Sequence, residues 1–253
     1  MIFRVNTLSC QLVLRLIDCR IVLSLDHGMW PLMKNPMKTR DRILYASLQL
    51  FNERGERAVT TNHIAAELGI SPGNLYYHFR NKTEIISELL EQYQHDILAL
   101  LIVPTDRQLT TADKLGYFHA LSSQFWRFRF LHRDIHHLIE ASDDLRKRYP
   151  IFSRQVMRHG RAIYEGFVAA GLMHATRPEI EALIINVWIV LTNWSNFLFM
   201  SGHLSRADHL DERLLKQGLR QMVFLEGPYL TPEGRAVYDQ LLETYGEANW
   251  FDE

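Results

Sequence analysis

Two runs of the chain concentrate side chains that could contact a phosphate or a base edge. Hydroxyls and an amide stand together at Thr60, Thr61 and Asn62, and residues 71–82 carry a second group. Hydroxyls donate hydrogen bonds to phosphate oxygens, and an Asn amide can pair with the major-groove edge of adenine. A lysine beside the first amides of a helix adds a cation, which suits a phosphate. The second group consists of Ser71, Asn74, Tyr76, Tyr77, His78 and Lys82.

The distribution of charge supports an anionic partner for the same part of the chain. The net charge is −1, but residues 37–82 carry seven Lys/Arg and four Asp/Glu, whereas residues 83–253 carry seventeen and twenty-three. A small basic module beside a larger acidic one indicates that the first faces something anionic. The apolar fraction of 47% is ordinary for a globular protein, and two cysteines exclude a disulfide-dense scaffold or a four-cysteine zinc site.

The first 36 residues differ from the rest. Arg15, Asp18 and Arg20 interrupt the apolar residues, so the segment fits neither a signal peptide nor a membrane anchor. We interpret residues 1–36 as an N-terminal extension, either disordered or translated from an upstream start. A real interaction arm is the alternative. We expect the protein to function without this segment.

A first amphipathic helix is predicted to support the polar groups. It starts near Thr39, and Ile43, Leu50 and Phe51 recur at i, i+7 and i+8, which places them on one helical face. Gly55 supplies a C-terminal stop. This helix should form the floor of a small domain.

Two short helices with a tight turn are predicted next. The first begins after Thr60 and ends at Gly69, and Pro72 takes the first position of the second, where a missing N–H costs nothing. This is the helix-turn-helix arrangement, whose second helix enters the major groove of DNA by its N-terminal residues. Pro72, Gly73 and Asn74 occupy that end. They are small or amide-bearing, so the backbone could approach a base edge closely.

These motifs resemble the TetR/AcrR family of transcriptional regulators over about 45 residues. The resemblance is carried by Ile64-Ala65, Gly69-Ile70-Ser71 and the octet Leu75-Tyr76-Tyr77-His78-Phe79-Arg80-Asn81-Lys82. It implies an all-α fold, with a three-helix DNA-binding domain at 37–83 and a helical ligand-binding and dimerisation domain at 84–253. Leu75 and Phe79 are expected in the core. The predicted DNA-binding residues are Thr60, Thr61, Asn62, Ser71, Pro72, Gly73, Asn74, Tyr76, Tyr77, His78 and Lys82.

The acidic remainder is expected to be helical. Glycines and prolines punctuate predicted helices at 84–103, 117–130, 135–148, 151–170, 178–200, 208–225 and 232–245. The run from Phe125 to Phe130 alternates aromatic residues with Trp126, Arg127 and Arg129, which could also be a strand that binds single-stranded nucleic acid. Because no partner strand lies within hairpin distance, we favour a helix end with its aromatics in the core.

Residues 182–205 contain no Lys, Arg, Asp or Glu and are long enough to span a bilayer. Asn186, Asn193 and Asn196 would be unfavourable in lipid, so we expect no membrane and instead a helix buried on nearly all sides. By resemblance, this segment and residues 208–225 form the interface of a homodimer.

The resemblance also implies a small apolar effector, and no cofactor is expected. Binding would favour a conformation whose recognition helices no longer match successive major grooves. Candidate pocket residues, chosen because they are aromatic or polar on the central helices, are Phe125, Trp126, Tyr164, Phe167, Trp188 and Asn193.

Catalysis has no support in the sequence. His132, His136 and Glu140 could share one helical face, but no further metal ligand is evident, so we expect no bound metal. Nucleophile, P-loop and dinucleotide signatures are absent. The predicted function is a cytoplasmic repressor that binds a palindromic DNA operator and is released by its effector. The alternative is a helical enzyme or carrier of small molecules with an N-terminal protein-docking module.

Overall fold

The structure, a computed structural model, describes residues 37–204 and 211–246, and over these ranges it is helical without a strand. The all-α class is therefore confirmed. The N-terminal extension and the start of the predicted helix 208–225 lie outside the described residues. In chain order the helices are α2 (Thr39–Arg54), the 3₁₀ turn η1 (Glu56–Ala58), α3 (Thr61–Leu68), α4 (Pro72–His78), α5 (Lys82–Leu100), α6 (Thr111–Arg127), α7 (Arg129–Ala141), α8 (Asp143–Ala169), α9 (Arg177–Met200), α10 (Glu212–Glu226), the 3₁₀ turn η2 (Gly227–Tyr229) and α11 (Pro232–Tyr245).

Helices α2, α3 and α4 enclose a small apolar core. Phe51 and Ile64 are fully buried, and so are Leu75 and Phe79 of α4, as the sequence predicted. Gly69 ends α3 in the left-handed conformation, with a φ of 64°, and its N–H bonds back to carbonyls of α3. Since this conformation is unfavourable for residues with a side chain, the glycine fixes the turn between α3 and α4.

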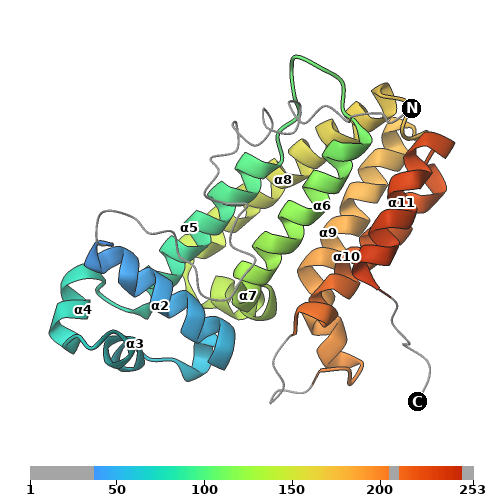
Figure 1. The fold of residues 1–253 in the computed structure, drawn as a ribbon. Helices are drawn as coiled ribbons and strands as arrows, with labels where there is room; N and C mark the ends of the chain where they lie inside the picture. The colour runs from blue at the N-terminus through green and yellow to red at the C-terminus, as the bar shows by residue number, and fades with distance from the viewer. Residues whose placement is uncertain (1–36, 205–210, 247–253) are drawn as a thin grey trace, which may run out of the picture. The chain divides into compact units, whose positions relative to one another are not determined.

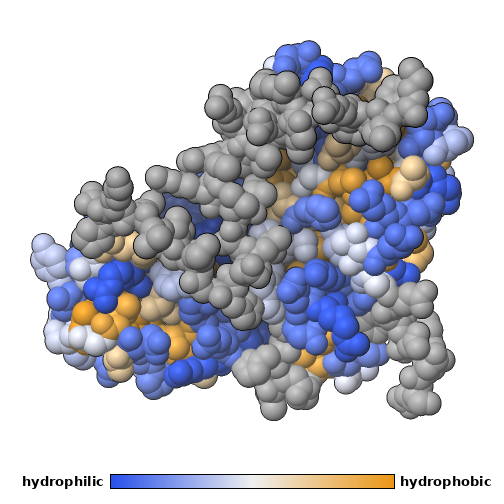
Figure 2. Space-filling view, in the orientation of Figure 1, coloured by the Kyte–Doolittle hydropathy of each residue, from blue (hydrophilic) through white to orange (hydrophobic). Residues whose placement is uncertain are grey.

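The longer helices pack beside one another in the larger part of the chain. Figure 1 shows α5, α6, α8, α9, α10 and α11 running alongside each other, and the side chains between them are the main core. Helix α5 begins at Lys82, directly after the cap residue Asn81, and continues from the α2–α4 core into these helices. On the side drawn in Figure 2, hydrophilic residues cover most of the described surface, with hydrophobic residues interspersed.

The boundary near Pro150 differs from the prediction. The sequence suggested two helices, at 135–148 and 151–170, whereas α8 runs through Pro150 and the break falls at Ser142. The Ser142 hydroxyl accepts from the N–H of Leu145 and caps α8. A proline removes one helical hydrogen bond, but an apolar stripe that includes Leu145 and Phe152 crosses it and packs into the core. Packing on that stripe outweighs the lost bond.

The aromatic run near residue 128 forms the junction of two helices. Helix α6 ends at Arg127, α7 begins at Arg129, and Phe125, Phe128 and Phe130 are all buried. The prediction of a helix end with aromatics in the core is confirmed, and the strand alternative is wrong.

Within the single chain, helix α9 is buried on one side only, so burial on nearly all sides stays a prediction that requires a partner molecule. Its length and composition would allow it to cross a membrane, yet only 22% of its most apolar window is buried. Ile180, Leu183 and Leu198 face the core, while Ile185 and Ile189 remain about half exposed. The described helices therefore pack against the side of α9 that carries Ile180, Leu183 and Leu198.

Candidate nucleic-acid interface and ligand cavity

The hydroxyls predicted at the interface cap the two short helices. Thr60 Oγ1 accepts from the N–H of His63 at 3.3 Å, and the His63 ring accepts from the N–H of Thr60 at 3.3 Å. Ser71 Oγ accepts from the N–H of Asn74 at 3.1 Å. These bonds leave the other first-turn N–H groups of α3 and α4 pointing outward, where they could bind an anion.

A side-chain contact joins the two helix starts. The hydroxyls of Thr61 and Tyr76 lie 3.0 Å apart, which ties the first turn of α3 to α4. Tyr76 remains about half exposed. The contact therefore fixes the spacing of α3 and α4 without removing either hydroxyl from solvent.

Several predicted contact residues present their side chains to solvent. Asn62 and Asn74 are exposed, and Tyr77 is 85% exposed. The Tyr77 ring meets the His78 ring edge to face, with 5.1 Å between centroids, and packs into no core. A large aromatic side chain kept in solvent in this way is unusual and points to a partner.

Gly73 is not required by the fold. Its φ is negative, and a Cβ atom placed there would meet only Ser71 Oγ, at 3.9 Å. Glycine in a helix costs up to about 1 kcal/mol relative to alanine. Because the described chain gives no internal reason for that cost, the glycine fits close approach by a partner.

Lys82 does not project toward solvent as predicted. Its ammonium donates to the carbonyls of Glu56 and Val59, both at 3.0 Å, and pairs with the Glu56 carboxylate at 2.7 Å. Three partners match the three N–H bonds of an ammonium. The geometry therefore favours a structural role for Lys82, holding η1 against α5, over a phosphate contact.

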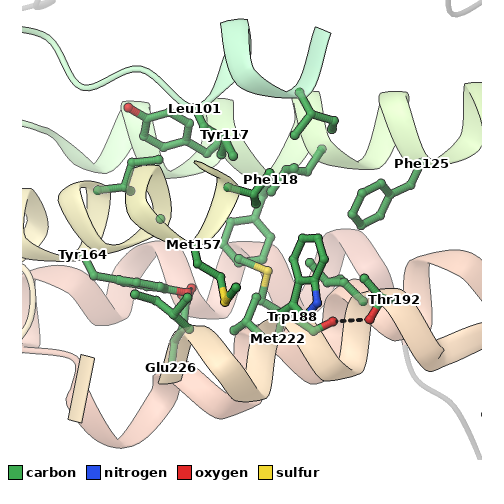
Figure 3. Close-up of a pocket in the computed structure, with 18 of the residues that line it drawn as sticks. Leu101, Tyr117, Phe118, Phe125, Met157, Tyr164, Trp188, Thr192, Met222 and Glu226 are labelled. Carbon is green, nitrogen blue, oxygen red and sulfur yellow. Dashed lines mark hydrogen bonds between the residues drawn. The ribbon is translucent and has the colours of Figure 1, made fainter. Parts of the chain in front are cut away.

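A cavity of about 110 Å³ lies among α5, α6, α7, α8, α9 and α10. One water needs roughly 10–15 Å³, so the cavity could hold a small molecule. Aromatic and aliphatic side chains provide most of its wall (Figure 3). They include Phe118, Leu121, Phe152, Met157, Ile163, Ile184, Leu191 and Met222.

Four of the six predicted pocket residues line this cavity: Phe125, Tyr164, Phe167 and Trp188. Trp126 and Asn193 do not, and both predictions are corrected. The Trp126 ring lies under the Arg129 guanidinium, 4.1 Å from ring centroid to Cζ. The exposed Asn193 amide donates to the carbonyl of Ile189 and to Thr192 Oγ1 on its own helix. Trp126 and Asn193 directly follow the cavity residues Phe125 and Thr192, and because successive residues of a helix are rotated by about 100°, they face away from the cavity.

Sequence reasoning missed a buried ion pair in the cavity wall. Lys114 of α6 and Glu226 of α10 are each 2% exposed and bond to one another, and Tyr164 donates to the second Glu226 oxygen at 2.6 Å. A signal was present. Lys114 lies on the stripe that continues through Phe118 and Leu121, and Glu226 ends the corresponding stripe of α10. A charge on an apolar stripe indicates a buried partner.

His132 lies in the cavity wall among aromatic rings and not in a metal site. Its ring centroid is 4.4 Å from that of Phe125 and 5.4 Å from that of Tyr93. Burial lowers the pKa of His132 to about 4, so the ring is neutral at physiological pH. His136 and Glu140 face solvent, and no group of three or more possible metal ligands is found within the described ranges.

Burial keeps the cavity tyrosines protonated. It raises the pKa of Tyr149 to about 12, and burial, together with the nearby Tyr149, raises the pKa of Tyr93 well above its usual value. Burial also raises the pKa of Tyr117 to about 12, and this hydroxyl donates to the carbonyl of Ile102 at 2.6 Å. The phenols are therefore neutral groups.

Comparison with known proteins agrees with both the small helical core and the larger helical part. Residues 43–89 match the family model described as bacterial regulatory proteins of the tetR family. Residues 92–238, more than half of the chain, match the TetR model described as a bacterial transcriptional repressor. These matches show that the chain belongs to the TetR family of bacterial transcriptional regulators.

Individual relatives support the same assignment. A TetR-family transcriptional regulator from Marinobacter aquaeolei VT8, known as a crystal structure, is 42% identical, with a TM-score of 0.73, covering 83% of this chain and 99% of that one. The regulator TtgR of Pseudomonas putida is 32% identical over 117 residues, 43% of this chain and 54% of its own. The repressor KstR2 of Mycolicibacterium smegmatis is 36% identical over 58 residues, 23% of this chain and 28% of its own. The chain thus spans about half the length, or less, of these curated relatives.

Family membership decides between the two functional hypotheses, a transcriptional regulator and a helical enzyme or carrier. TetR-family proteins are DNA-binding transcriptional regulators, generally repressors that respond to ligands, and not enzymes. The alternative of a helical enzyme with a protein-docking module is therefore set aside.

Proposed function

We propose that the protein is a repressor that binds a palindromic operator as a homodimer in the cytoplasm and is released by a small effector bound in the cavity. The observation that carries the proposal is the exposed surface at the starts of α3 and α4. There Asn62, Asn74 and Tyr77 reach solvent, and Gly73 leaves room for a close neighbour.

The geometry supports a division of roles at this surface. Asn74, in the first turn of α4, would read a base edge in the major groove, since that end of a recognition helix faces the bases. Gly73 and Pro72 would let the backbone approach. Tyr77 and His78 would donate to phosphate oxygens, as would the Thr61 hydroxyl and the first-turn N–H groups of Thr61, Asn62 and Gly73, which lie beside the capping residues Thr60 and Ser71.

Dimerisation would cover the apolar face of α9. Ile185 and Ile189 on α9 and Phe224 on α10 are between 43% and 52% exposed, and Met200 is 85% exposed. A second copy related by a twofold axis would bury the same residues from both chains. The exposed amides of Asn186 and Asn193 lie on α9 as well, and they favour a protein partner over lipid.

The route from cavity to DNA would pass through Asn52. Its side-chain amide donates to the carbonyl of Arg127 at 2.8 Å, and its Oδ1 accepts from the N–H of Phe130 at 3.1 Å. These two bonds attach α2 to the α6–α7 junction. Phe125 and His132, on either side of that junction, line the cavity. An effector that displaces these side chains would shift the junction, and with it the helix-turn-helix.

The test is to capture genomic DNA fragments with the purified protein and sequence them. We expect enrichment of a site with two inverted halves about one helical turn apart. The site should lose affinity when the Asn74→Ala variant replaces the natural protein. No enriched sequence, or equal enrichment by that variant, would contradict the proposal.

A further inference from the structure

The polar groups of the cavity wall form two separate sets. One set, which we call the ion-pair end, consists of Lys114, Tyr164 and Glu226. The other, which we call the tyrosine–histidine end, consists of Tyr93, His132 and Tyr149, which also line a small side chamber with Thr192. Figure 3 shows Tyr164 and Glu226 on one side of the cavity and Thr192 with Phe125 on the other.

The charges at the ion-pair end are already balanced, which disfavours a charged ligand there. Lys114 and Glu226 neutralise each other, and Tyr164 occupies the second oxygen of Glu226. No other Asp, Glu, Lys or Arg lines the cavity as the described residues form it. An ionic ligand would either break this pair or bury a charge without a partner, and both are costly in an apolar site.

The tyrosine–histidine end has free hydrogen-bonding capacity. His132 Nε2 is buried and lacks a hydrogen-bond partner among the described residues. The hydroxyls of Tyr93 and Tyr149 likewise make no hydrogen bond within the described chain. A buried polar atom without a partner is unfavourable, so a ligand that supplies one gains affinity.

We propose that the effector is an uncharged, mainly aromatic molecule with one hydroxyl or carbonyl group, held by His132 with Tyr93 and Tyr149. Its apolar body would lie toward Phe118, Trp188 and Met222. This inference rests on the proposed function, because it takes the cavity as the effector site. Neutral Tyr and His groups both donate and accept, which suits either a hydroxyl or a carbonyl.

Three probes of one shape test the proposal by calorimetry: 2-naphthol, naphthalene and 2-naphthoate. We expect 2-naphthol to bind at least about fivefold more tightly than naphthalene, the effect of one hydrogen bond. We expect no binding of 2-naphthoate at concentrations where 2-naphthol saturates. Equal affinity for 2-naphthol and naphthalene, binding of 2-naphthoate, or binding of none of the three would overturn the proposal.

Variants locate the hydrogen bond. His132→Phe and Tyr149→Phe should lower the affinity for 2-naphthol toward that for naphthalene and leave naphthalene unchanged. His136→Phe, one turn further on α7 and exposed, is the matched control and should change neither. Equal loss of both probes in His132→Phe and Tyr149→Phe, or no loss of either, would contradict the assignment.

Operator binding without any probe separates this inference from the proposed function. A protein that binds the selected operator but none of the probes overturns only the effector chemistry. If the protein binds the three probes with the expected order of affinities but selects no DNA sequence, the proposed repressor function is wrong and the inference about the cavity still holds.

Discussion

The candidate DNA interface and the ligand cavity of this protein differ in where they place their polar side chains. At the candidate interface, the polar groups of Asn62, Asn74 and Tyr77 stay in solvent, and the hydroxyls of Thr60 and Ser71 cap helices. In the cavity, the polar groups come from helices far apart in sequence, and Lys114 and Glu226, 112 residues apart, satisfy each other in the interior. A site whose residues are close in sequence can be recognised from the sequence. A site whose residues come together only when distant helices pack can be recognised only from the structure.

The largest effect should come from breaking the buried pair in the cavity. Lys114→Met leaves the Glu226 carboxylate without its cation, and removing one partner of a buried pair costs about 3–5 kcal/mol of unfolding free energy. Urea denaturation followed by circular dichroism measures the loss. The double variant Lys114→Met, Glu226→Gln should recover most of it, because no charge remains buried. A loss below about 1 kcal/mol in the single variant would contradict the pairing.

Next in size is the link between the two regions at Asn52. Asn52→Ala removes the donor to Arg127 and the acceptor for Phe130, and leaving both backbone groups unpaired should cost about 1–3 kcal/mol. Hydrogen exchange at the Phe130 amide should also become faster. Gln49→Ala on the same helix is the control, and equal behaviour of the two variants would argue against the link.

A smaller effect is expected from the protonation of His132. Its pKa is about 4 when folded and near 6.5 when unfolded, so between these values the unfolded chain binds more protons and stability falls as the pH falls. Relative to His132→Phe, the natural protein should lose about 1–2 kcal/mol between pH 7 and pH 5. Urea midpoints of both proteins at the two pH values give the difference. Parallel changes in both proteins would show that His132 is not held neutral.

The smallest effect concerns Lys82, for which the sequence and the structure suggest different roles. The Lys82 ammonium is bonded to Glu56 and Val59. The slope of operator affinity against salt concentration should therefore fall no more in Lys82→Ala than it does in Arg80→Ala. Arg80 is an exposed cation two residues away, so this variant reports the loss of one charge in the same region. A slope reduced by about one further counterion per subunit in Lys82→Ala would restore the phosphate contact.

Sequence patterns predicted the elements that local chemistry controls. The capped starts of α3 and α4, the turn at Gly69 and the buried Leu75 and Phe79 all follow from short-range rules, and they match the structure. Pro150 misled the prediction because packing along α8 outweighs one lost hydrogen bond.

Pairings between distant helices could not be predicted in the same way. Composition alone pointed to Phe125, Tyr164, Phe167 and Trp188, but it could not distinguish them from Trp126 and Asn193, since the inner face of a helix depends on what packs against it. The same limit applies to α9. Its uncharged sequence predicts that the helix is covered, but it does not identify the molecule that covers it.

Gly73→Ala tests the central claim, that the surface of α3 and α4 binds DNA, most directly. The added methyl group has space within the protein, so stability should stay the same or rise by up to about 1 kcal/mol, while affinity for the selected operator should fall by about tenfold, or 1.4 kcal/mol. Gly116→Ala, on α6 with no atom near its added Cβ, is the matched control and should keep full affinity. Fluorescence anisotropy with a labelled operator measures all three proteins. If Gly73→Ala binds as tightly as Gly116→Ala, this surface is not the DNA reader.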